Sequence, residues 1–221
     1  LELAEPRPIV PDAPPPERVV TFPFEASLGQ LLTRKWSELP QDNWEFFRPA
    51  RGRVVLPAGQ EAKLEVAFNA TEQLQHLEKL PAGALHTISL SGPDVRDEHL
   101  DALAALVGLR GLHLKYTSVG DSGFARLTGL TELRDFRVWD AEVTDVGFEE
   151  MASFKKLSNL WIQGADITNK SIPVLRELVN LSRLHIEDTY ITPEAMIVLR
   201  GDMRHTTVTP LQGSAQQAAG R

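Results

Sequence analysis

Two tryptophans, Trp139 and Trp161, stand close in the chain to residues that form ion pairs and hydrogen bonds. An indole ring offers a large, rigid apolar surface, and tryptophan and arginine are the residue types most enriched at binding hot spots. The two tryptophans and their polar neighbours therefore predict a surface that binds another molecule. The candidate binding residues are Asp135, Arg137, Trp139, Asn159, Trp161, Gln163, Arg183 and His185.

Sequence patterns for catalysis are absent. The chain contains no G-x-S-x-G, no H-E-x-x-H, no phosphate-binding glycine loop and no cysteine. Asp140, Glu142 and Asp145 form an acidic stretch, but their spacing does not match the known calcium-binding loop. We therefore expect no enzyme, no bound metal and no cofactor, and we interpret the acidic stretch as a solvated loop.

A 24-residue repeat must position the candidate binding residues. Five segments read L-x-x-L-x-L: LHTISL, LRGLHL, LRDFRV, LSNLWI and LSRLHI. Apolar residues also recur ten, fifteen, eighteen and twenty-one positions after the leading leucine. Internal periodicity of this length is the mark of a solenoid. The leading leucines are Leu85, Leu109, Leu133, Leu157 and Leu181.

Each repeat predicts a short strand, a turn and a helix. Apolar positions two apart share one side of a strand, and the columns at fifteen, eighteen and twenty-one share one helical face. We expect parallel strands near 88–90, 112–114, 136–138, 160–162 and 184–186, with a helix starting about eight residues after each. Threonine and aspartate before each helix are suited to cap it, and Phe148 belongs to the shared core.

The repeat places the candidate residues on the outward side of the strands. Trp139 and Trp161 fall on adjacent strands, and we expect Arg137 between them, stacked against Trp161. His113 and His185 share one row but lie three repeats apart, about 14 Å at ~4.8 Å per strand, which is too far to share a zinc ion. We interpret both histidines as solvated surface residues.

The motifs LHLKYTSVGDSGFARLTGL and FRVWDAEVTDVGFEEM resemble the 24-residue leucine-rich repeats of many bacterial proteins, over residues 85 to about 204. The stretch FPFEASLGQLL…RGRVVLPAGQEAKLEV resembles, more weakly, the segment that precedes such repeats. The resemblance implies an α/β solenoid with strands on the concave face, helices on the convex face and a binding or scaffold role. It implies no catalytic residues. Such repeats often carry a polar ladder eight residues after the leading leucine, and here only Thr117 and Thr189 suit it.

The two ends of the chain differ from the repeats. Residues 1–20 are rich in proline, which favours an extended spacer, although a proline motif for a recognition domain is the alternative. Residues 21–84 predict a small N-terminal cap with a hairpin over residues 53–68 and a degenerate first repeat. Residues 85–204 hold the five repeats. We expect a capping strand at residues 205–210 and a disordered tail at residues 211–221.

The net charge of the chain excludes some classes of binding partner. The formal net charge of −7 argues against nucleic acid and against an anionic membrane surface. No apolar run approaches the roughly 20 residues of a membrane helix, and the first residue is leucine, so a signal or tether upstream of Leu1 is compatible with the sequence. The resemblance favours an extracytoplasmic or membrane-tethered location in a bacterium.

Three functions remain open on the sequence. The first is a non-catalytic scaffold that binds another protein on its concave face. The second is a structural subunit of a larger assembly. The third is a carbohydrate-recognition domain in which Trp139 and Trp161 stack on sugar rings.

Overall fold

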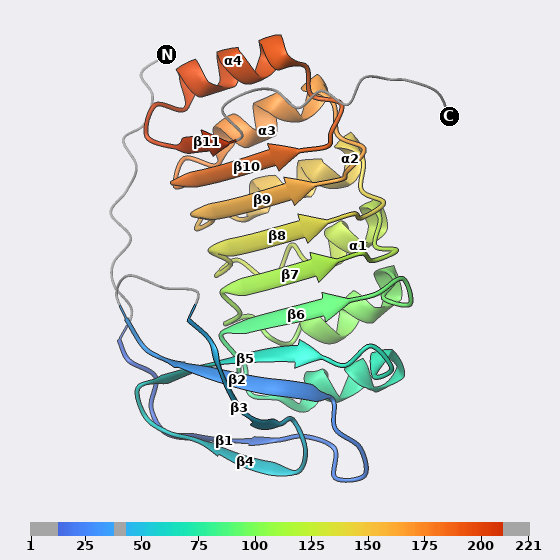
Figure 1. Cartoon of the computed structure of the whole chain (residues 1–221), viewed down its shortest axis with the longest axis vertical. Helices are drawn as coiled ribbons and strands as arrows, with labels where there is room; N and C mark the ends of the chain where they lie inside the picture. The colour runs from blue at the N-terminus through green and yellow to red at the C-terminus, as the bar shows by residue number, and fades with distance from the viewer. Residues whose placement is uncertain (1–12, 38–42, 210–221) are drawn as a thin grey trace.

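The computed structural model describes residues 13–37 and 43–209. In this part of the chain, nine strands form one sheet in the order β11-β10-β9-β8-β7-β6-β5-β2-β3, and β1 and β4 form a second sheet. Figure 1 shows the parallel strands stacked as a ladder, with the helices behind them. The strands are β1 (Arg18–Thr21), β2 (Gly29–Lys35), β3 (Glu45–Pro49), β4 (Arg53–Leu56), β5 (Gln60–Val66), β6 (Thr87–Ser91), β7 (Gly111–Lys115), β8 (Asp135–Trp139), β9 (Asn159–Gln163), β10 (Arg183–Glu187) and β11 (Thr207–Thr209).

Short helices follow the strands of the ladder. Several are 3-10 helices, which suit a connection of one or two turns. The 3-10 helices are η1 (Thr71–Lys79), η2 (Asp97–Leu103), η3 (Glu149–Ser153) and η4 (Asn169–Ser171), and the α-helices are α1 (Asp121–Arg126), α2 (Asp145–Phe148), α3 (Ile172–Glu177) and α4 (Pro193–Asp202).

The five strands predicted from the leucine spacing are β6 to β10, and they are parallel. Their register is offset by one repeat at each step, so that Ile88 pairs with Leu112 and Leu112 pairs with Phe136. A helix or helical turn follows each strand and lies on the opposite side from the sheet's exposed face (Figure 1). The chain is therefore a leucine-rich repeat solenoid, as the sequence predicted. We call the outward side of β6 to β10 the concave face.

The core runs continuously through the stack between strands and helices. The leading leucines and the inward strand residues are almost completely buried. Phenylalanines fill the middle repeats, with ring centroids 5.4 Å apart for Phe124 and Phe136 and 5.9 Å apart for Phe136 and Phe154. Phe148 is 1% exposed, which confirms the prediction that its column is shared core.

A left-handed residue ends each strand of the repeats. Gly92, Tyr116, Asp140, Gly164 and Asp188 occupy the same position in successive repeats, and all have positive φ. The turn lets the backbone N–H of four of these residues donate to the strand end of the next repeat, for example from Tyr116 to the Trp139 carbonyl at 2.7 Å. A left-handed conformation costs a bulky residue about 1–2 kcal/mol, whereas asparagine and aspartate tolerate it.

We expect Tyr116→Asn to stabilise the chain. Tyr116 has a φ of 55° and a side chain that is 63% exposed, so the substitution relieves backbone strain and loses little packing. The free energy of unfolding should rise by about 0.5–1 kcal/mol in a urea titration. Tyr190 is similarly exposed but is not among the positive-φ residues, so Tyr190→Asn is the control and should bring no gain. Equal effects of the two substitutions would contradict the strain argument.

A ladder of hydrogen bonds joins the repeats, but at a different column from the one the sequence suggested. Asp121 accepts from the backbone N–H of Thr144 at 2.8 Å and from its hydroxyl at 2.8 Å. Asp145 makes the same pair of bonds to Thr168, at 2.9 and 2.7 Å. Thr117 is buried, and its hydroxyl oxygen has no partner among the described residues. The prediction that Thr117, eight residues after the leading leucine, belongs to a polar ladder is therefore wrong.

The same threonines cap the helices that follow them. Thr144, Thr168 and Thr192 each accept a hydrogen bond from a backbone N–H in the first turn of their helix. This confirms the predicted capping role of threonine. The aspartates of the column instead bind the next repeat, because a carboxylate there can accept from both the backbone N–H and the hydroxyl of the following threonine.

The hairpin predicted over residues 53–68 is wrong. β4 pairs antiparallel with β1 in the small sheet, whereas β5 pairs antiparallel with β2 and parallel with β6. Both edges of β5 are therefore occupied, and none is left for β4. Leu64 pairs with Ile88 in the same register that joins the repeats, so β5 is the first strand of the solenoid as well as part of the cap.

The chain ends fall partly outside the described residues. β1 begins at Arg18, so the last three residues of the spacer predicted for residues 1–20 belong to the cap. β11 pairs in parallel with β10 and buries Val208, which covers the last apolar layer of strands. The tail predicted at residues 211–221 and the part of the proline-rich stretch at residues 1–12 lie outside the described residues.

Candidate functional site on the concave face

The strand register brings the eight candidate residues onto three adjacent strands. Three rows cross the sheet from β8 to β10. The first holds Asp135, Asn159 and Arg183; the second holds Arg137, Trp161 and His185; the third holds Trp139, Gln163 and Glu187. The inward residues between them are buried, so the pleat directs these side chains away from the core.

A strip of four aromatic rings crosses the concave face from β7 to β10. Trp139 and Trp161 lie 6.0 Å apart between ring centroids and are tilted by 34°. His185 stacks on Trp161 at 3.6 Å, and His113 meets Trp139 edge-on at 6.2 Å. We call these four side chains the aromatic strip. Its two indoles are half-buried, so each keeps part of its surface open to solvent.

One expected contact of the strip is wrong. Among the described residues, His185 and not Arg137 stacks on Trp161. The Arg137 guanidinium instead pairs with Asp135, donating from Nε to Oδ1 at 2.9 Å with Nη2 2.8 Å from Oδ2. This ion pair along one strand takes the place of the expected contact with the ring. The cation over an indole of the strip is Lys115, whose Nζ lies 5.3 Å from the Trp139 ring centroid.

The Trp161 indole carries an unused donor. Its Nε1 is shielded from solvent and has no hydrogen-bond acceptor among the described residues. A buried donor without an acceptor costs roughly 1–3 kcal/mol. The fold therefore gains nothing from the N–H of this side chain, and a phenylalanine would satisfy its packing without that cost.

Polar side chains border the strip on both sides. Arg183 donates from Nε to the Asn159 side-chain oxygen at 3.0 Å. On the other side, Gln163 donates to Asp188 at 3.4 Å. His185 contacts Glu187 at 3.2 Å and the Thr209 hydroxyl at 2.9 Å. These bonds fix the orientation of the rim residues.

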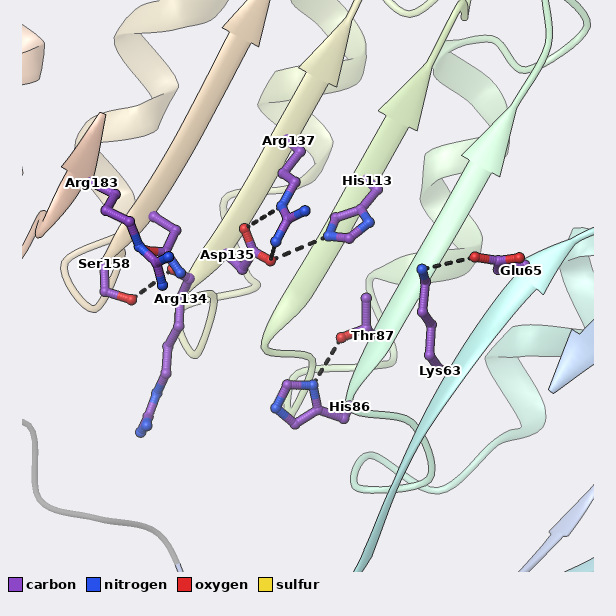
Figure 2. Close-up of polar contacts among 11 residues, drawn as sticks. Lys63, Glu65, His86, Thr87, His113, Arg134, Asp135, Arg137, Ser158 and Arg183 are labelled. Carbon is purple, nitrogen blue, oxygen red and sulfur yellow. Dashed lines mark hydrogen bonds and ion pairs between the residues drawn. The ribbon is translucent and has the colours of Figure 1, made fainter. Parts of the chain in front are cut away.

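On the first two strands of the concave face, β6 and β7, several outward side chains are almost inaccessible to solvent. Thr87, Ser89 and His113 are only 3–4% exposed. His113 was predicted to be a solvated surface residue, and this is wrong, because its ring packs against Trp139 and Nε2 lies 3.3 Å from an Asp135 oxygen. Figure 2 shows His113, Asp135 and Arg137 joined in one hydrogen-bonded group.

The pKa values of two residues in this group are lowered, with opposite effects on their charge. Burial lowers the pKa of His113 and outweighs the hydrogen bond to Asp135, so the imidazole is neutral at neutral pH. Burial acts to raise the pKa of Asp135, but hydrogen bonds from His113 and Arg137 prevail and hold it below its usual value. The neutral His113 ring therefore donates a hydrogen bond to the charged Asp135 carboxylate, and this bond has a structural role. Asp135 stays anionic at the edge of the aromatic strip.

A second buried group lies where the cap meets the first repeat. Glu61 pairs with Arg34 at 2.6 Å, and the His86 ring lies 3.3 Å from the other Glu61 oxygen. Trp44 contacts both Arg34 and His86. Burial and then the positive charges of Arg34 and Arg110 lower the pKa of His86 to about 3.

This depressed pKa predicts that acid destabilises the fold. Below a pH of about 6.5 the unfolded chain takes up a proton at His86, whereas the folded chain does so only near pH 3. The free energy of unfolding should therefore fall on acidification from about pH 7 to about pH 4.5, by on the order of 2–3 kcal/mol from this group. Urea titrations at the two pH values measure the loss. His86→Gln should reduce it, and a variant that keeps the full loss would show that His86 is not its source.

Three residues of the site were not among the eight candidates. The same rows also contain His113, Lys115 and Glu187. In the sequence, each of these three looks like an ordinary polar residue of a strand. Their outward position on neighbouring strands was the available signal. Their contacts with Trp139 and His185 depend on side-chain rotamers, which strand periodicity does not specify.

The described residues show neither a metal cluster nor a membrane helix. Within residues 13–37 and 43–209, no three histidine, aspartate or glutamate side chains gather closely enough to hold a metal ion. In the same ranges, no helix has the length and apolar character needed to cross a membrane.

Comparisons with known proteins find similar solved structures. No protein-family model and no curated protein matches the chain. Among solved structures it is similar to an internalin C2 from Listeria monocytogenes, with 23% identity, a TM-score of 0.45 and coverage of 58% of this chain and 54% of that chain. It is also similar to the internalin inlF from the same organism, with 14% identity, a TM-score of 0.42 and coverage of 63% and 51%. The chain spans about half the length of these structures.

Proposed function

We propose that this chain is a non-catalytic scaffold that binds another protein through its concave face. The observation that carries the proposal is the aromatic strip, in which two half-buried indoles lie side by side in the middle of an otherwise polar sheet surface. An apolar centre with a polar border is the anatomy of a protein interface. The binding residues in this proposal are Asp135, Arg137, Trp139, Asn159, Trp161, Gln163, Arg183 and His185.

The faces of both indole rings are partly covered by other side chains, and this favours a protein partner over a sugar. A sugar ring needs the open face of an indole, but His185 covers one face of Trp161 and Lys115 lies over Trp139. The aromatic strip exposes the edges of its rings and parts of their faces, next to polar atoms of His185 and Lys115. Such a surface suits side chains of a protein, which can contact both the rings and the rim.

The ion pairs of the rim support recognition that depends on shape and charge together. Asp135 and Arg137 are already joined, so they present a fixed dipole beside the strip and lose no rotamer freedom on binding. Arg183, at the other end of the first row, is exposed and directed by Asn159. The convex side has exposed ion pairs such as Lys155 with Glu177, but lacks an equivalent aromatic group among the described residues.

The experiment that tests the proposal is affinity purification from the native source with the parent chain and two variants. Trp161→Ala alters the strip, and Glu177→Ala alters an exposed residue on helix α3. The partner should be retained by the parent and by Glu177→Ala, and lost or strongly reduced with Trp161→Ala. A glycan array tests the carbohydrate alternative, and the mass in solution tests the structural-subunit alternative.

The resemblance to bacterial repeat proteins adds one element to this proposal. It favours a location outside the cytoplasm or at a membrane tether. Fractionation of the native cells tests that placement, which the binding role does not require.

A further inference from the structure

We propose that the concave face also binds the concave face of a second copy of this chain, with a two-fold axis that runs along the ladder of strands. The inference goes beyond the proposed function, because it names an occupant of that surface. A two-fold interface uses the same patch of both copies, so the patch must be complementary to itself. The charges at the two edges of the concave face meet this condition.

The edge at the C-terminal ends of the strands is acidic. Asp140 and Asp188 directly follow β8 and β10, and Glu142 and Asp166 are the third residues after β8 and β9. Glu142 and Asp166 are exposed. Within the described parts of the chain, no lysine or arginine forms an ion pair with any of these carboxylates. We call these residues the acidic edge.

Acids on the helix side of the solenoid are balanced differently. Several of them pair with a cation of a neighbouring repeat, as Glu177 does with Lys155. The other such pairs are Arg126–Asp101, Lys156–Glu132 and Arg176–Asp202. Pairs of this kind neutralise acids of the helix side, whereas the acidic edge keeps its charge for a contact with another molecule.

The opposite edge of the concave face is basic. Arg110 and Arg134 directly precede β7 and β8, and Arg183 is the first residue of β10. We call these arginines the basic edge, and Figure 2 shows Arg134 and Arg183 on this side of the sheet. Asp135 lies beside them, but its charge is balanced by Arg137. A five-residue strand separates the two edges by about 17 Å.

The positions of the two edges decide how a second copy can lie on the face. A two-fold axis parallel to the strands would set like charges against each other along both edges, which is unfavourable. A two-fold axis parallel to the ladder reverses the strand direction of the second copy, so that each basic edge faces an acidic edge. Arg134 at the start of β8 then faces Glu142 of the second copy, and Arg183 at the start of β10 faces Asp188 of the second copy. The symmetry forms each contact twice.

The aromatic strip lies near the axis of this arrangement. Trp161 and His185 belong to the middle row of outward residues, halfway between the two edges. The parts of the half-buried indoles that are open to solvent are then covered by the second copy. The interface has an apolar centre and a charged border, as protein interfaces do.

The size of the face suits a weak but specific dimer. Five strands span about 24 Å at ~4.8 Å each, and a five-residue strand with one more residue at each end spans about 23 Å. The projected area is about 550 Å² per copy, and protruding side chains add to it, against about 800 Å² per partner in a standard interface. Phe46, which is 61% exposed, extends the same side into the cap, because it pairs with Leu32 and Leu32 pairs with the outward Lys63.

The test is a charge swap between two variants of the full chain, followed by sedimentation velocity and native mass spectrometry. One variant carries Arg134→Glu and Arg183→Glu, and the other carries Glu142→Lys and Asp166→Lys. We expect the parent to form a dimer, and each variant alone to have a dissociation constant at least about tenfold higher. An equimolar mixture of the two variants should form a heterodimer, because the two reversed edges then face each other and the two unaltered edges do likewise.

Two controls separate this interface from other causes. Lys155→Glu combined with Glu177→Lys swaps an exposed ion pair on the helix side, and this variant should dimerise like the parent. Circular dichroism checks the fold of every variant. A photoreactive amino acid at Gln163 in the otherwise unaltered chain gives a measurement that does not depend on the charge variants. Irradiation should link two copies from position 163 and not from position 177.

The proposal is overturned by a parent that stays monomeric up to its solubility limit, by a dimer that persists in both charge variants, or by a mixture of folded variants without a heterodimer. If the variants do not fold, the absence of a link between two copies from position 163 overturns it. A monomeric parent that still captures a different protein through Trp161 leaves the proposed function standing and removes only this inference. A dimer of the expected kind without Trp161-dependent capture of a different protein removes the proposed function alone.

Discussion

Phe148→Ala is expected to lower the free energy of unfolding by about 3–5 kcal/mol, the usual cost of truncating a buried phenylalanine. Phe148 is 1% exposed and packs with Phe136, Val143 and Met151 around a space too small for a water molecule. The void that the substitution leaves is lined by apolar side chains, so it offers a water molecule no hydrogen-bond partner and stays empty. The neighbouring rings cannot collapse into it without leaving their own contacts. A urea titration measures the loss.

The loss should extend beyond one repeat. Each repeat of a solenoid contacts only its neighbours, so a weakened repeat also loosens the strands on either side. Amide hydrogen exchange should therefore become faster in β7, β8 and β9. The control is Val146→Ala, a residue of the same helix with a side chain that is 68% exposed. It should cost little, and a loss below about 1 kcal/mol at Phe148 would show that this column does not support the core.

Trp161→Ala is expected to weaken partner binding by about 2 kcal/mol or more, roughly thirtyfold in the dissociation constant. Trp161 touches both Trp139 and His185, at centroid distances of 6.0 and 3.6 Å, so its removal interrupts the aromatic strip at its centre. The remaining rings would then be separate surface groups instead of one continuous surface.

The fold should survive this substitution. Trp161 is only half-buried, and its indole donor forms no bond within the described residues. Circular dichroism and a cooperative unfolding transition check the fold, and titration calorimetry with the purified partner measures the affinity. Glu177→Ala is the matched control on the convex side, where an exposed ion pair contributes little. Unchanged affinity in the Trp161 variant would remove the strip from the binding surface.

The solenoid was predictable because its signal is repeated. One apolar residue in a strand position carries little information, but seven apolar columns over five repeats fix the strand positions, their direction and the outward rows. Leu64 shows the limit of this argument. It lies one full repeat before Ile88 and pairs with it, yet the cap around it has no repeated pattern to reveal that β5 continues the ladder. Turn residues nearby instead suggested a local hairpin.

The ladder and the capping residues show a second limit. Threonine before a helix predicts a local cap, and Thr144 forms one. The neighbouring Asp121 has the same preference for helix starts, but its carboxylate binds Thr144 of the next repeat. Sequence propensity describes local bonds, whereas this choice depends on how closely two repeats stack.

The candidate site was predictable in its position and less so in its contacts. Alternation along a strand placed Trp139, Trp161 and Arg137 on one face, and the register confirms that placement. Which ring stacks on which partner depends on competing interactions. Arg137 has a carboxylate two residues away on its own strand, and that ion pair outweighs a cation–π contact.

The central claim is that the concave face, and not the convex face, binds the partner, and site-specific photo-cross-linking tests it most directly. A photoreactive amino acid is placed at Gln163, beside the aromatic strip, or at Glu177 on helix α3. After irradiation of the native complex, we predict a covalent adduct with the partner from position 163 and none from position 177. An adduct from position 177 with none from position 163 would contradict the account.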